Sequence, residues 1–387
     1  MCNLKMKQLL TPNVIVPFVF FAKHDFDDAT KKQFEKTWDE NVGGSRAVLL
    51  YTKEINELVL KYIDSPKWTI KHTSALTIAD VVKSTTSTTS PTIPAETSAL
   101  IWPALEKALA LKTFAGKEIV LASFVKFIKA STSFLDAESG IAAQTKKIAI
   151  REAKRNNDTY RPFAFTELGK YAETRTDVDM WDEIYNIIAP ILEDLSSEDH
   201  MDTSTATSTS DSRKKDGVSK GGESTESETI TAGIEALFRG INIKHLDPSP
   251  LTHFPKLIET LTPLLKSPLM TITTRATLYE RSKVLFDGLR KRTHEQKENH
   301  YKMCVQFFEV LELPSGAGSE GIRIKRGEAA EMIVEAWKAG VFGMWSEGRE
   351  GREEVRGMMI KGMSEALEGE RNESVKVVFG RVKKLLE

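Results

Sequence analysis

A repeat of 46 residues is the feature of this sequence that most limits the folds open to it. Aromatic residues stand just before or at the start of three apolar segments, at Trp68, Phe114 and Tyr160, and the intervals are 114 − 68 = 46 and 160 − 114 = 46. After each aromatic residue the apolar positions recur with the spacing of one helix face. A period of about 40–47 residues built from helices is typical of HEAT and armadillo repeats.

A second kind of helical segment precedes the first and carries an internal proline. A proline inside a helix removes one backbone hydrogen bond and bends the helix. The alternation of the two kinds predicts an all-α fold, an α-solenoid of HEAT/armadillo-type helix pairs, because one pair cannot bury its apolar stripe alone. The alternative is an irregular helical bundle, which has no reason to keep one period. The four internal prolines are Pro17, Pro103, Pro190 and Pro263.

The helical pattern also sets the number of repeats. Apolar residues recur at three and four along Arg46–Ile63 and again along Val178–Leu195, and each range is predicted to be one amphipathic helix. About sixteen such segments follow one another, with no convincing strand pattern between them. Taken in pairs, they predict about seven to eight repeats.

One stretch of the chain breaks the pattern. From Ser196 to Thr229, 15 of 34 residues are Ser or Thr, and only Met201, Ala206 and Val218 are apolar. Such a composition buries too little apolar surface to offset the entropy lost on ordering. The sequence therefore predicts a first part of the solenoid at 1–195, a disordered acidic insert at 196–229, and a second part at 230–387. Without the insert, 387 − 34 = 353 residues remain, between seven and eight periods of 46.

Composition limits the partners and the compartment. Lys and Arg total 54 against 55 Asp and Glu, and this balance gives no overall electrostatic reason to expect nucleic-acid binding. The longest apolar run, Val14–Ala22, is too short for a spanning helix and contains a proline, so no membrane insertion is expected. Cys2 and Cys304 lie too far apart in the sequence to suggest a disulfide framework. A reducing compartment, cytoplasmic and nuclear, is expected.

Charge is organised locally even though it balances overall. From Gln144 to Arg175 there are eight basic and four acidic residues, whereas from Thr176 to Thr229 there are fourteen acidic and four basic ones. Four of the basic residues stand at helical spacing and form a candidate surface for an acidic partner protein. The alternative is a solvated helix face without a specific partner. The four candidate partner-binding residues are Lys147, Arg151, Lys154 and Arg155.

Three short motifs carry no catalytic or metal chemistry in this context. Gly217–Gly221 spells G-x-S-x-G, but it lies in the predicted insert rather than between a strand and a helix. Gly316–Gly321 fits G-x-G-x-x-G, but a helical segment precedes it, so a loop is expected rather than a nucleotide site. His300 and Cys304 share a helix face, yet two ligands do not make a metal site. The sequence predicts no catalytic residue, no cofactor and no bound metal.

Several repeat segments resemble a known family. The block Thr-Phe-Ala-Gly-Lys-Glu at 113–118 and the run Trp-Asp-Glu-Asn-Val-Gly-Gly-Ser at 38–45 are the most specific. With the helices around them, from about Val14 to Leu195, they resemble the carboxy-terminal region of the proteasome stabiliser family of HEAT-repeat adaptors. The resemblance is weaker beyond Thr229. Family members are much longer, so the chain looks like a carboxy-terminal fragment, a truncated product or a short form.

The resemblance implies a non-enzymatic function. Members of the family bind the core and regulatory particles of the proteasome, tether them and act in assembly quality control. Two other kinds of helical-repeat protein remain as alternatives: an importin-type transport receptor and, less favoured, a nucleic-acid-binding repeat. Because a solenoid without an end cap leaves an apolar stripe open, self-association through the first helices is also expected. The candidate residues for that stripe are Val14, Ile15, Phe18 and Phe21.

Overall fold

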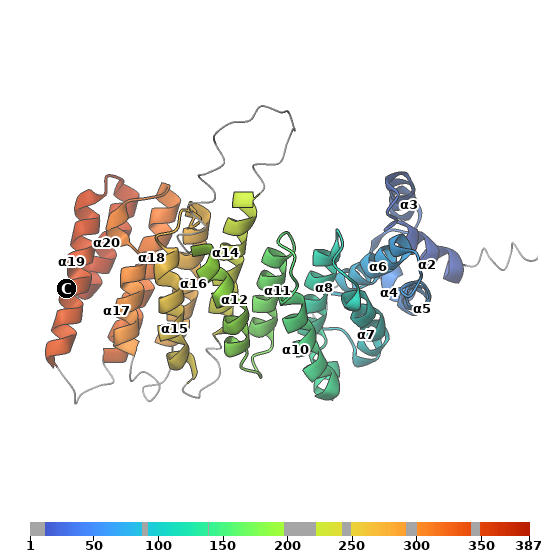
Figure 1. The fold of residues 1–387 in the computed structure, drawn as a ribbon, viewed down its shortest axis with the longest axis horizontal. Helices are drawn as coiled ribbons and strands as arrows, with labels where there is room; N and C mark the ends of the chain where they lie inside the picture. Colours follow the sequence, from blue (N-terminus) through green and yellow to red (C-terminus); the bar gives the residue numbers. More distant parts are fainter. Residues whose placement is uncertain are drawn as a thin grey trace, which may run out of the picture. The chain divides into compact units, whose positions relative to one another are not determined.

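The chain folds into α-helices. The three-dimensional structure is a computed structural model, and its described residues form eighteen α-helices and one short 3-10 helix, with no strand among them (Figure 1). The prediction of an all-α solenoid of helix pairs is confirmed. The structure describes residues 12–86, 92–137, 139–196, 222–241, 249–291, 300–341 and 349–387.

The chain divides into two compact units, Met1–Glu167 and Leu168–Glu387. The division falls within α11 (Arg161–Thr174). The first unit contains α2 (Pro12–Ala22), α3 (Asp28–Asn41), α4 (Gly44–Leu50), α5 (Thr52–Tyr62), α6 (Trp68–Thr86), α7 (Ala95–Ala110), α8 (Lys117–Ala130), α9 (Thr132–Ala137) and α10 (Ser139–Ala153). The second contains α12 (Trp181–Ser196), α14 (Gly222–Gly240), α15 (Ser249–Leu264), α16 (Ile272–Arg290), α17 (His300–Val310), η2 (Leu313–Ser315), α18 (Glu320–Val341), α19 (Arg349–Gly369) and α20 (Glu373–Leu386).

Each unit is a stack of helix pairs. In order along the chain, α5 to α20 supply seven pairs, each with a first and a second helix, within the predicted range of seven to eight. The second helices pack on one another, as α6 does on α8 in the first unit and α14, α16, α18 and α20 do in succession in the second. First helices do the same, α5 on α7 and α12 on α15.

The period read from the sequence reappears as contacts between neighbouring repeats. Polar side chains on successive second helices, at least one of each pair charged, meet at sequence separations of 45 to 47 residues, because each contact joins equivalent positions of adjacent pairs. Most of these contacts are only partly buried, so each stabilises the stack modestly, while their repetition fixes the register of the helices. The pairs are Arg281–Glu235, Lys283–Glu328, Arg290–Glu335 and Arg326–Tyr279.

Two glycines allow second helices of the second unit to approach closely. A Cβ at Gly169 would lie 2.7 Å from the Cα of Ala236 on α14, and one at Gly327 would lie 2.6 Å from a side-chain carbon of Val378 on α20. No real side chain tolerates such distances. These positions therefore need glycine because of packing, although glycine weakens a helix interior by about 1 kcal/mol.

The prolines predicted inside first helices are where the sequence placed them. Pro17 lies in α2, Pro103 in α7, Pro190 in α12 and Pro263 in α15. In each helix the missing N–H leaves one carbonyl without its usual helical partner. Among the first helices of the seven pairs, α7, α12 and α15 carry an internal proline and α5, α10, α17 and α19 do not, so the two kinds of helix alternate only in part.

One predicted helix is divided in two. The sequence predicted a continuous helix over Arg46–Ile63, but α4 ends at Leu50 and α5 begins at Thr52, with Tyr51 in a turn at φ −108° and ψ 19°. The Thr52 hydroxyl donates to the Val48 carbonyl at 2.8 Å, the acceptor that the Thr52 N–H would use in an unbroken helix. Thr77 and Thr85 make the same bond inside the unbroken α6, so this bond accompanies the break but does not explain it.

The predicted insert at 196–229 extends too far at both ends. Ser196 is the last residue of α12, and α14 begins at Gly222, so residues 222–229 are helical. Thr229 is buried, and its hydroxyl donates to the Thr225 carbonyl, a local bond that lets threonine lie inside a helix. The hydroxyls of Thr231 and Thr274 lie 2.7 Å apart between α14 and α16. Residues 197–221 lie outside the described part.

Candidate protein-binding surface

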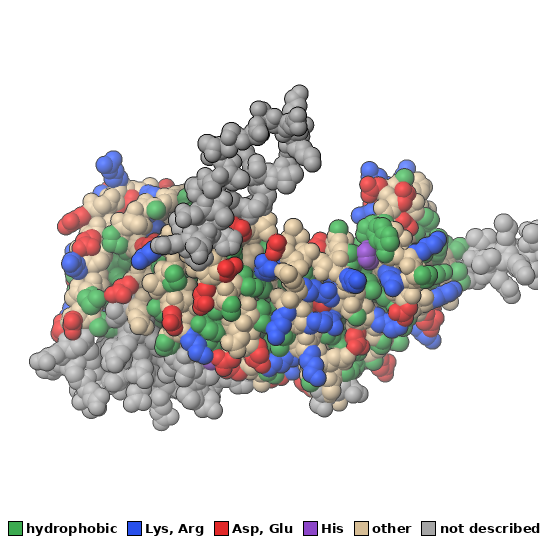
Figure 2. Space-filling model, viewed as in Figure 1, with side chains coloured by type: hydrophobic (Ala, Val, Ile, Leu, Met, Phe, Trp, Pro, Cys, Tyr) green, Lys and Arg blue, Asp and Glu red, His purple; other side chains and the backbone are tan. Residues whose placement is uncertain are grey.

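Helix α10 carries the basic face predicted from the sequence. Lys147 lies on α10 and Lys154 directly follows its last residue, Ala153; both are exposed. Because the Lys154 N–H still donates to the Ile150 carbonyl, the spacing of seven residues places the two lysines on one side of the helix. Among the described residues, neither lysine forms an ion pair. Figure 2 shows Lys and Arg side chains gathered on this face of the molecule over α8 and α10. These two lysines are free to contact an acidic partner.

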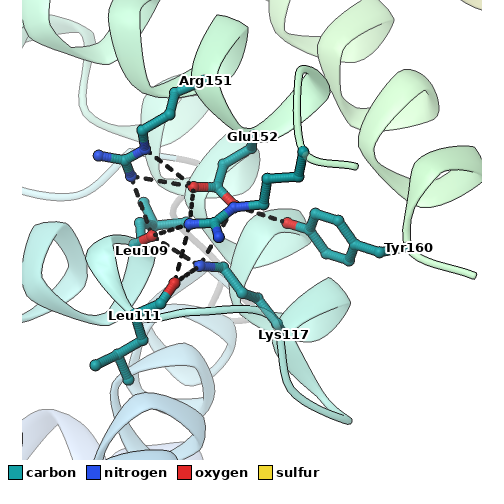
Figure 3. Close-up of polar contacts among 7 residues, drawn as sticks. Leu109, Leu111, Lys117, Arg151, Glu152 and Tyr160 are labelled. Atoms are coloured by element: carbon teal, nitrogen blue, oxygen red, sulfur yellow. Dashed lines mark hydrogen bonds and ion pairs between the residues drawn. The ribbon is translucent and has the colours of Figure 1, made fainter. Parts of the chain in front are cut away.

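The two arginines of the predicted set are occupied within the chain. Arg155 donates to both carboxylate oxygens of Glu152, at 2.6 and 2.9 Å, and to the Leu111 carbonyl at 2.9 Å. Arg151 donates to Glu152 at 3.1 Å and to the Leu109 carbonyl at 3.0 Å, although nearly half of its side chain is exposed. Both arginines therefore connect α10 to the end of α7 in the preceding repeat (Figure 3).

A buried carboxylate lies at the centre of this arrangement. Glu152 is fully buried, and besides the two arginines it accepts a hydrogen bond from the Tyr160 hydroxyl at 3.1 Å. Burial and the charge of Glu152 raise the pKa of Tyr160, so its hydroxyl keeps the proton that it donates. Tyr160 is the third aromatic of the 46-residue repeat, and this bond explains why a tyrosine stands there.

Lys117, the first residue of α8, is the remaining charged member of this buried group. The Lys117 ammonium lies 3.4 Å from Glu152 and donates to the carbonyls of Leu109 and Leu111. Burial lowers the pKa of Lys117 to about 8 against the attraction of Glu152, and the positive charges of Arg155 and Arg151 lower it further. Lysine appears within the Thr-Phe-Ala-Gly-Lys-Glu block because the last carbonyls of α7 need donors.

We call these residues, Lys117, Arg151, Glu152, Arg155 and Tyr160 with the two carbonyls, the Glu152 cluster (Figure 3). The cluster fixes α10 against the turn between α7 and α8 through the bonds of Lys117, Arg151 and Arg155, and the Tyr160 bond joins it to the residue before α11. A fixed α10 presents Lys147 and Lys154 at constant positions. Of the four predicted residues, the structure thus brings two to the surface and directs two inward.

An aromatic cluster that the sequence reading missed lies elsewhere on the first unit. The ring of His72 stacks on Phe114 at 3.9 Å, and it lies 5.2 Å from Trp68 and 5.4 Å from Phe26. Trp68 is 58% exposed. Burial, followed by the charge of Lys117, lowers the pKa of His72, which favours a neutral ring. Trp68 and Phe114 marked the repeat, but nothing in the pattern placed Phe26 and His72 beside them.

The apolar residues expected to be open on the first helix differ in exposure. Val14 is 48% and Phe18 is 52% exposed, whereas Ile15 and Phe21 are only partly accessible. Phe18 also makes an edge contact with Phe34, and Phe21 lies beside Tyr62. The exposed part of the predicted stripe therefore consists mainly of Val14 and Phe18.

The candidate metal ligand Cys304 lies in a helix, and Gly316 and Gly318 of the glycine motif at 316–321 lie in a turn. Cys304 is buried, and burial raises the pKa of its thiol, which disfavours the thiolate that binds metals. The described residues include no cluster of three or more metal-ligating side chains. Gly316 and Gly318 adopt positive φ in the turn between η2 and α18, and no strand precedes them in the described chain. Gly217–Gly221 and His294 lie outside the described residues.

No helix in the described part of the chain has the length and apolar character required to span a bilayer.

The fold defines an α-helical repeat protein of the armadillo type. The chain belongs to the family described as "ECM29, C-terminal ARM-like repeats", whose sequence model matches residues 128–385, or 258 of 387 residues. The match continues almost to the end of the chain, so the segment beyond Thr229, where the resemblance was expected to be weaker, belongs to the family as well.

Two curated proteins are similar to the chain. The Schizosaccharomyces pombe protein named "Proteasome component ecm29" is 26% identical over 172 residues, which are 44% of this chain and 10% of that protein. The Homo sapiens "Proteasome adapter and scaffold protein ECM29" is 27% identical over 194 residues, 48% of this chain and 10% of that protein. The match thus spans 10% of the length of each curated relative.

A crystal structure of an engineered protein aligns over 97% of this chain and 99% of that chain, with 12% sequence identity. Its TM-score of 0.27 is too low to support an argument about the fold.

Proposed function

We propose that this chain is a non-enzymatic adaptor that binds the proteasome and stabilises the association of its core and regulatory particles. The observation that carries the proposal is membership of the ECM29 carboxy-terminal repeat family. The names of the two curated relatives, a proteasome component and a proteasome adapter and scaffold, support the choice of partner. We place this function in the cytoplasm and the nucleus, where proteasomes act.

The exposed lysines of α10 are the contact that we propose for an acidic surface of the proteasome. Lys147 and Lys154 have no ion-pair partner among the described residues, and the Glu152 cluster fixes the helix that carries them. A rigid helix that presents unpaired charge loses little entropy when it binds. Long-range attraction between opposite charges also speeds association.

The test is an affinity purification of the tagged chain from cell extract, scored separately for core-particle and regulatory-particle subunits. The chain is compared with Lys147→Glu/Lys154→Glu, which leaves both arginines of the Glu152 cluster intact. Lys126→Glu/Lys129→Glu is the matched control, because these two lysines are exposed on α8 and also lack an ion-pair partner in the described residues.

We expect both particles to be recovered with the unchanged chain and with the α8 control, and several-fold less of both with the α10 variant. Recovery of neither particle with the unchanged chain contradicts proteasome binding. Equal recovery with all three chains contradicts the role of Lys147 and Lys154 alone. Recovery of one particle only contradicts the association of the two particles by this chain.

Self-association through the first helices is a separate part of the proposal. The exposed side chains of Val14 and Phe18 support it. A Val14→Ser/Phe18→Ser variant removes most of the apolar surface at this place. We expect light scattering at micromolar concentration to give a larger mass for the unchanged chain than for the variant, and a monomer in both contradicts the idea.

A further inference from the structure

An apolar pocket of about 240 Å³ opens in the second unit between the end of α17, η2 and α19. It lies within the second compact unit, whereas α10 belongs to the first. No part of the proposed function uses it. Its lining includes Phe308, Glu309, Leu313, Pro314, Met358 and Met359.

One wall of the pocket is held rigidly. Glu312 lines it with φ 47° and ψ 48°, the one non-glycine residue with a positive φ among those described. Such a conformation costs about 1–3 kcal/mol and persists only where its surroundings enforce it. The fully buried Arg326 donates to the Glu312 carbonyl at 3.2 Å and to the Ser315 hydroxyl at 2.9 Å, and Arg275 pairs with the Glu312 carboxylate. This wall is formed before any ligand arrives.

The opposite wall is adaptable. Met358, which is 48% exposed, and Met359 come from α19, together with Gly362. Methionine side chains are flexible and polarizable, and they repack around apolar guests of different shape. Because Gly362 has no side chain, the pocket stays open beside Phe308, whose nearest ring atom would lie 3.5 Å from an added Cβ.

The volume of the pocket limits the size of the ligand that it can hold. Sites for drug-sized molecules measure about 300–1,000 Å³, whereas a cavity of about 150 Å³ already binds benzene. A pocket of about 240 Å³ lies between these values and fits one large amino-acid side chain.

The carboxylates near the pocket favour a positively charged residue next to the inserted side chain. Glu309 lines the pocket from α17, and Glu354 stands four residues before Met358 on the same face of α19. Both carboxylates are exposed and have no ion-pair partner in the described chain, whereas Glu312 is paired with Arg275 and Glu365 with Lys361. The unpaired charge beside the pocket is therefore negative on two sides.

We propose that this pocket is a docking site for a peptide segment of another protein that inserts one leucine- or phenylalanine-sized side chain and places a lysine or arginine beside it. The apolar side chain contacts Phe308, Leu313 and the two methionines. The neighbouring cation meets Glu309 or Glu354. The site does not depend on proteasome binding through α10, and the experiments below do not involve the proteasome.

The decisive variant fills the pocket without weakening the helix. Gly362→Leu places a side chain in the cavity, and leucine favours a helix over glycine by about 1 kcal/mol. Gly357→Leu is the matched control, because Gly357 lies on the same helix, is exposed and has no atom within 4 Å of an added Cβ. Loss of binding in the first variant alone, with the circular dichroism spectrum and thermal midpoint of the control, does not come from unfolding.

The probes are short labelled peptides in which a central Leu, Phe or Ala stands between two lysines, and the same peptides with two glutamates. We expect the Leu and Phe peptides with lysines to bind about tenfold more tightly than the Ala peptide. The glutamate peptides should bind more weakly still. Glu309→Gln should reduce the preference for lysine, and Gly362→Leu should abolish binding while Gly357→Leu retains it.

Nuclear magnetic resonance of methyl-labelled methionine locates the peptide. Of the 11 methionines, we expect the Met358 and Met359 resonances, assigned from the corresponding Met→Leu variants, to shift most on titration. Peptide binding that leaves these two resonances unchanged, or that survives Gly362→Leu, overturns the proposal. Absence of binding by every peptide also overturns it, and a concentration-dependent dimer that Gly362→Leu abolishes would assign the pocket to a second copy instead.

Discussion

Lys117 in the first unit and Arg326 in the second are both fully buried cations, but their surroundings differ. Lys117 lies 3.4 Å from the Glu152 carboxylate of the following repeat. Arg326 has no carboxylate within ion-pairing distance among the described residues, and binds two carbonyls and two hydroxyls, with the Tyr279 ring 5.2 Å away. Both cations donate hydrogen bonds to backbone carbonyls at or after the end of a first helix. Lys117 does so beside a carboxylate, and Arg326 does so without one among the described residues.

The difference follows from the shapes of the two cations. A lysine ammonium is a compact charge with three donors, and burial is tolerable when a carboxylate compensates it. An arginine guanidinium spreads its charge over five donors in a plane, so several neutral acceptors satisfy it. The comparison teaches that stability depends on one anion in the first unit and on the geometry of neutral acceptors in the second.

Removal of the anion should have the largest effect. Glu152→Gln leaves the charges of Lys117, Arg151 and Arg155 together without compensation, and breaking a buried ion pair in this way costs about 3–5 kcal/mol. We expect a clear fall in the thermal midpoint by circular dichroism and faster amide exchange in α10.

Glu57→Gln is the control, since Glu57 is exposed on α5 and its substitution should change stability by less than about 0.5 kcal/mol. A Glu152→Gln chain as stable as this control would show that carbonyl oxygens alone satisfy the cations of the first unit, as they do at Arg326.

Loss of planar geometry should rank second. Arg326→Lys keeps the charge but cannot reach all four acceptors at once, so at least one buried carbonyl loses its donor at a cost of about 1–3 kcal/mol. Hydrogen exchange of peptides from η2 and α18 measures the effect, because helical repeats open locally. Lys325→Arg, at the neighbouring exposed position, should leave exchange unchanged, and equal behaviour of the two variants would contradict the role of geometry.

The pH dependence of stability separates the two cations further. The pKa of Lys117 is lowered from 10.5 to about 8, so between pH 8 and 10 the unfolded chain holds this proton while the folded chain releases it. The free energy of unfolding should therefore rise with pH in this window, by about 1 kcal/mol per pH unit relative to Lys117→Met. Urea unfolding at several pH values measures the difference.

The window ends near pH 10, because the unfolded chain then also begins to lose the Lys117 proton, whose ordinary pKa is 10.5. Tyr160 is present in both chains, so its raised pKa affects both in the same direction. An Arg326→Met chain, compared in the same way, should show no such rise, since arginine side chains keep their proton throughout this range. A difference between the unchanged chain and Lys117→Met that stays constant from pH 8 to 10 would contradict the lowered pKa.

The smallest effect is expected at the exposed lysines beside the Glu152 cluster. Lys147→Glu/Lys154→Glu should change the free energy of unfolding by no more than about 0.5 kcal/mol, because exposed charges without partners contribute little. Urea unfolding gives the value. A larger loss would mean that the α10 variant cannot separate partner binding from folding.

Much of the fold followed from the period of the sequence. The interval between Trp68, Phe114 and Tyr160 predicted stacked helix pairs, and contacts such as Lys283–Glu328, 45 residues apart, reproduce it. The break at Tyr51 did not follow, since the spacing of apolar residues continues through it from α4 to α5. The beginning of α14 did not follow either, because buried Ser and Thr resemble a polar linker until their local hydrogen bonds are known.

The candidate surface could be predicted only in part. Helical spacing placed Lys147, Arg151, Lys154 and Arg155 near one another, and Lys147 and Arg151 lie on α10 while Lys154 and Arg155 directly follow its last residue, Ala153. Spacing did not separate the two lysines from the two arginines. The pocket beside Glu312 gave no signal in the sequence, since its walls come from α17, η2 and α19 and from a backbone conformation that glutamate rarely adopts.

The sequence by itself determined the all-α repeat and the family, because these depend on periodic patterns that each segment carries within itself. The tertiary structure decided which charges are buried. Arg155 turns inward because the Leu111 carbonyl, 44 residues away, and Glu152 supply acceptors there, whereas Lys154, its neighbour in the chain, meets none in the described residues and stays in water. A buried charge requires partners that only the packing of one repeat on the next brings within reach.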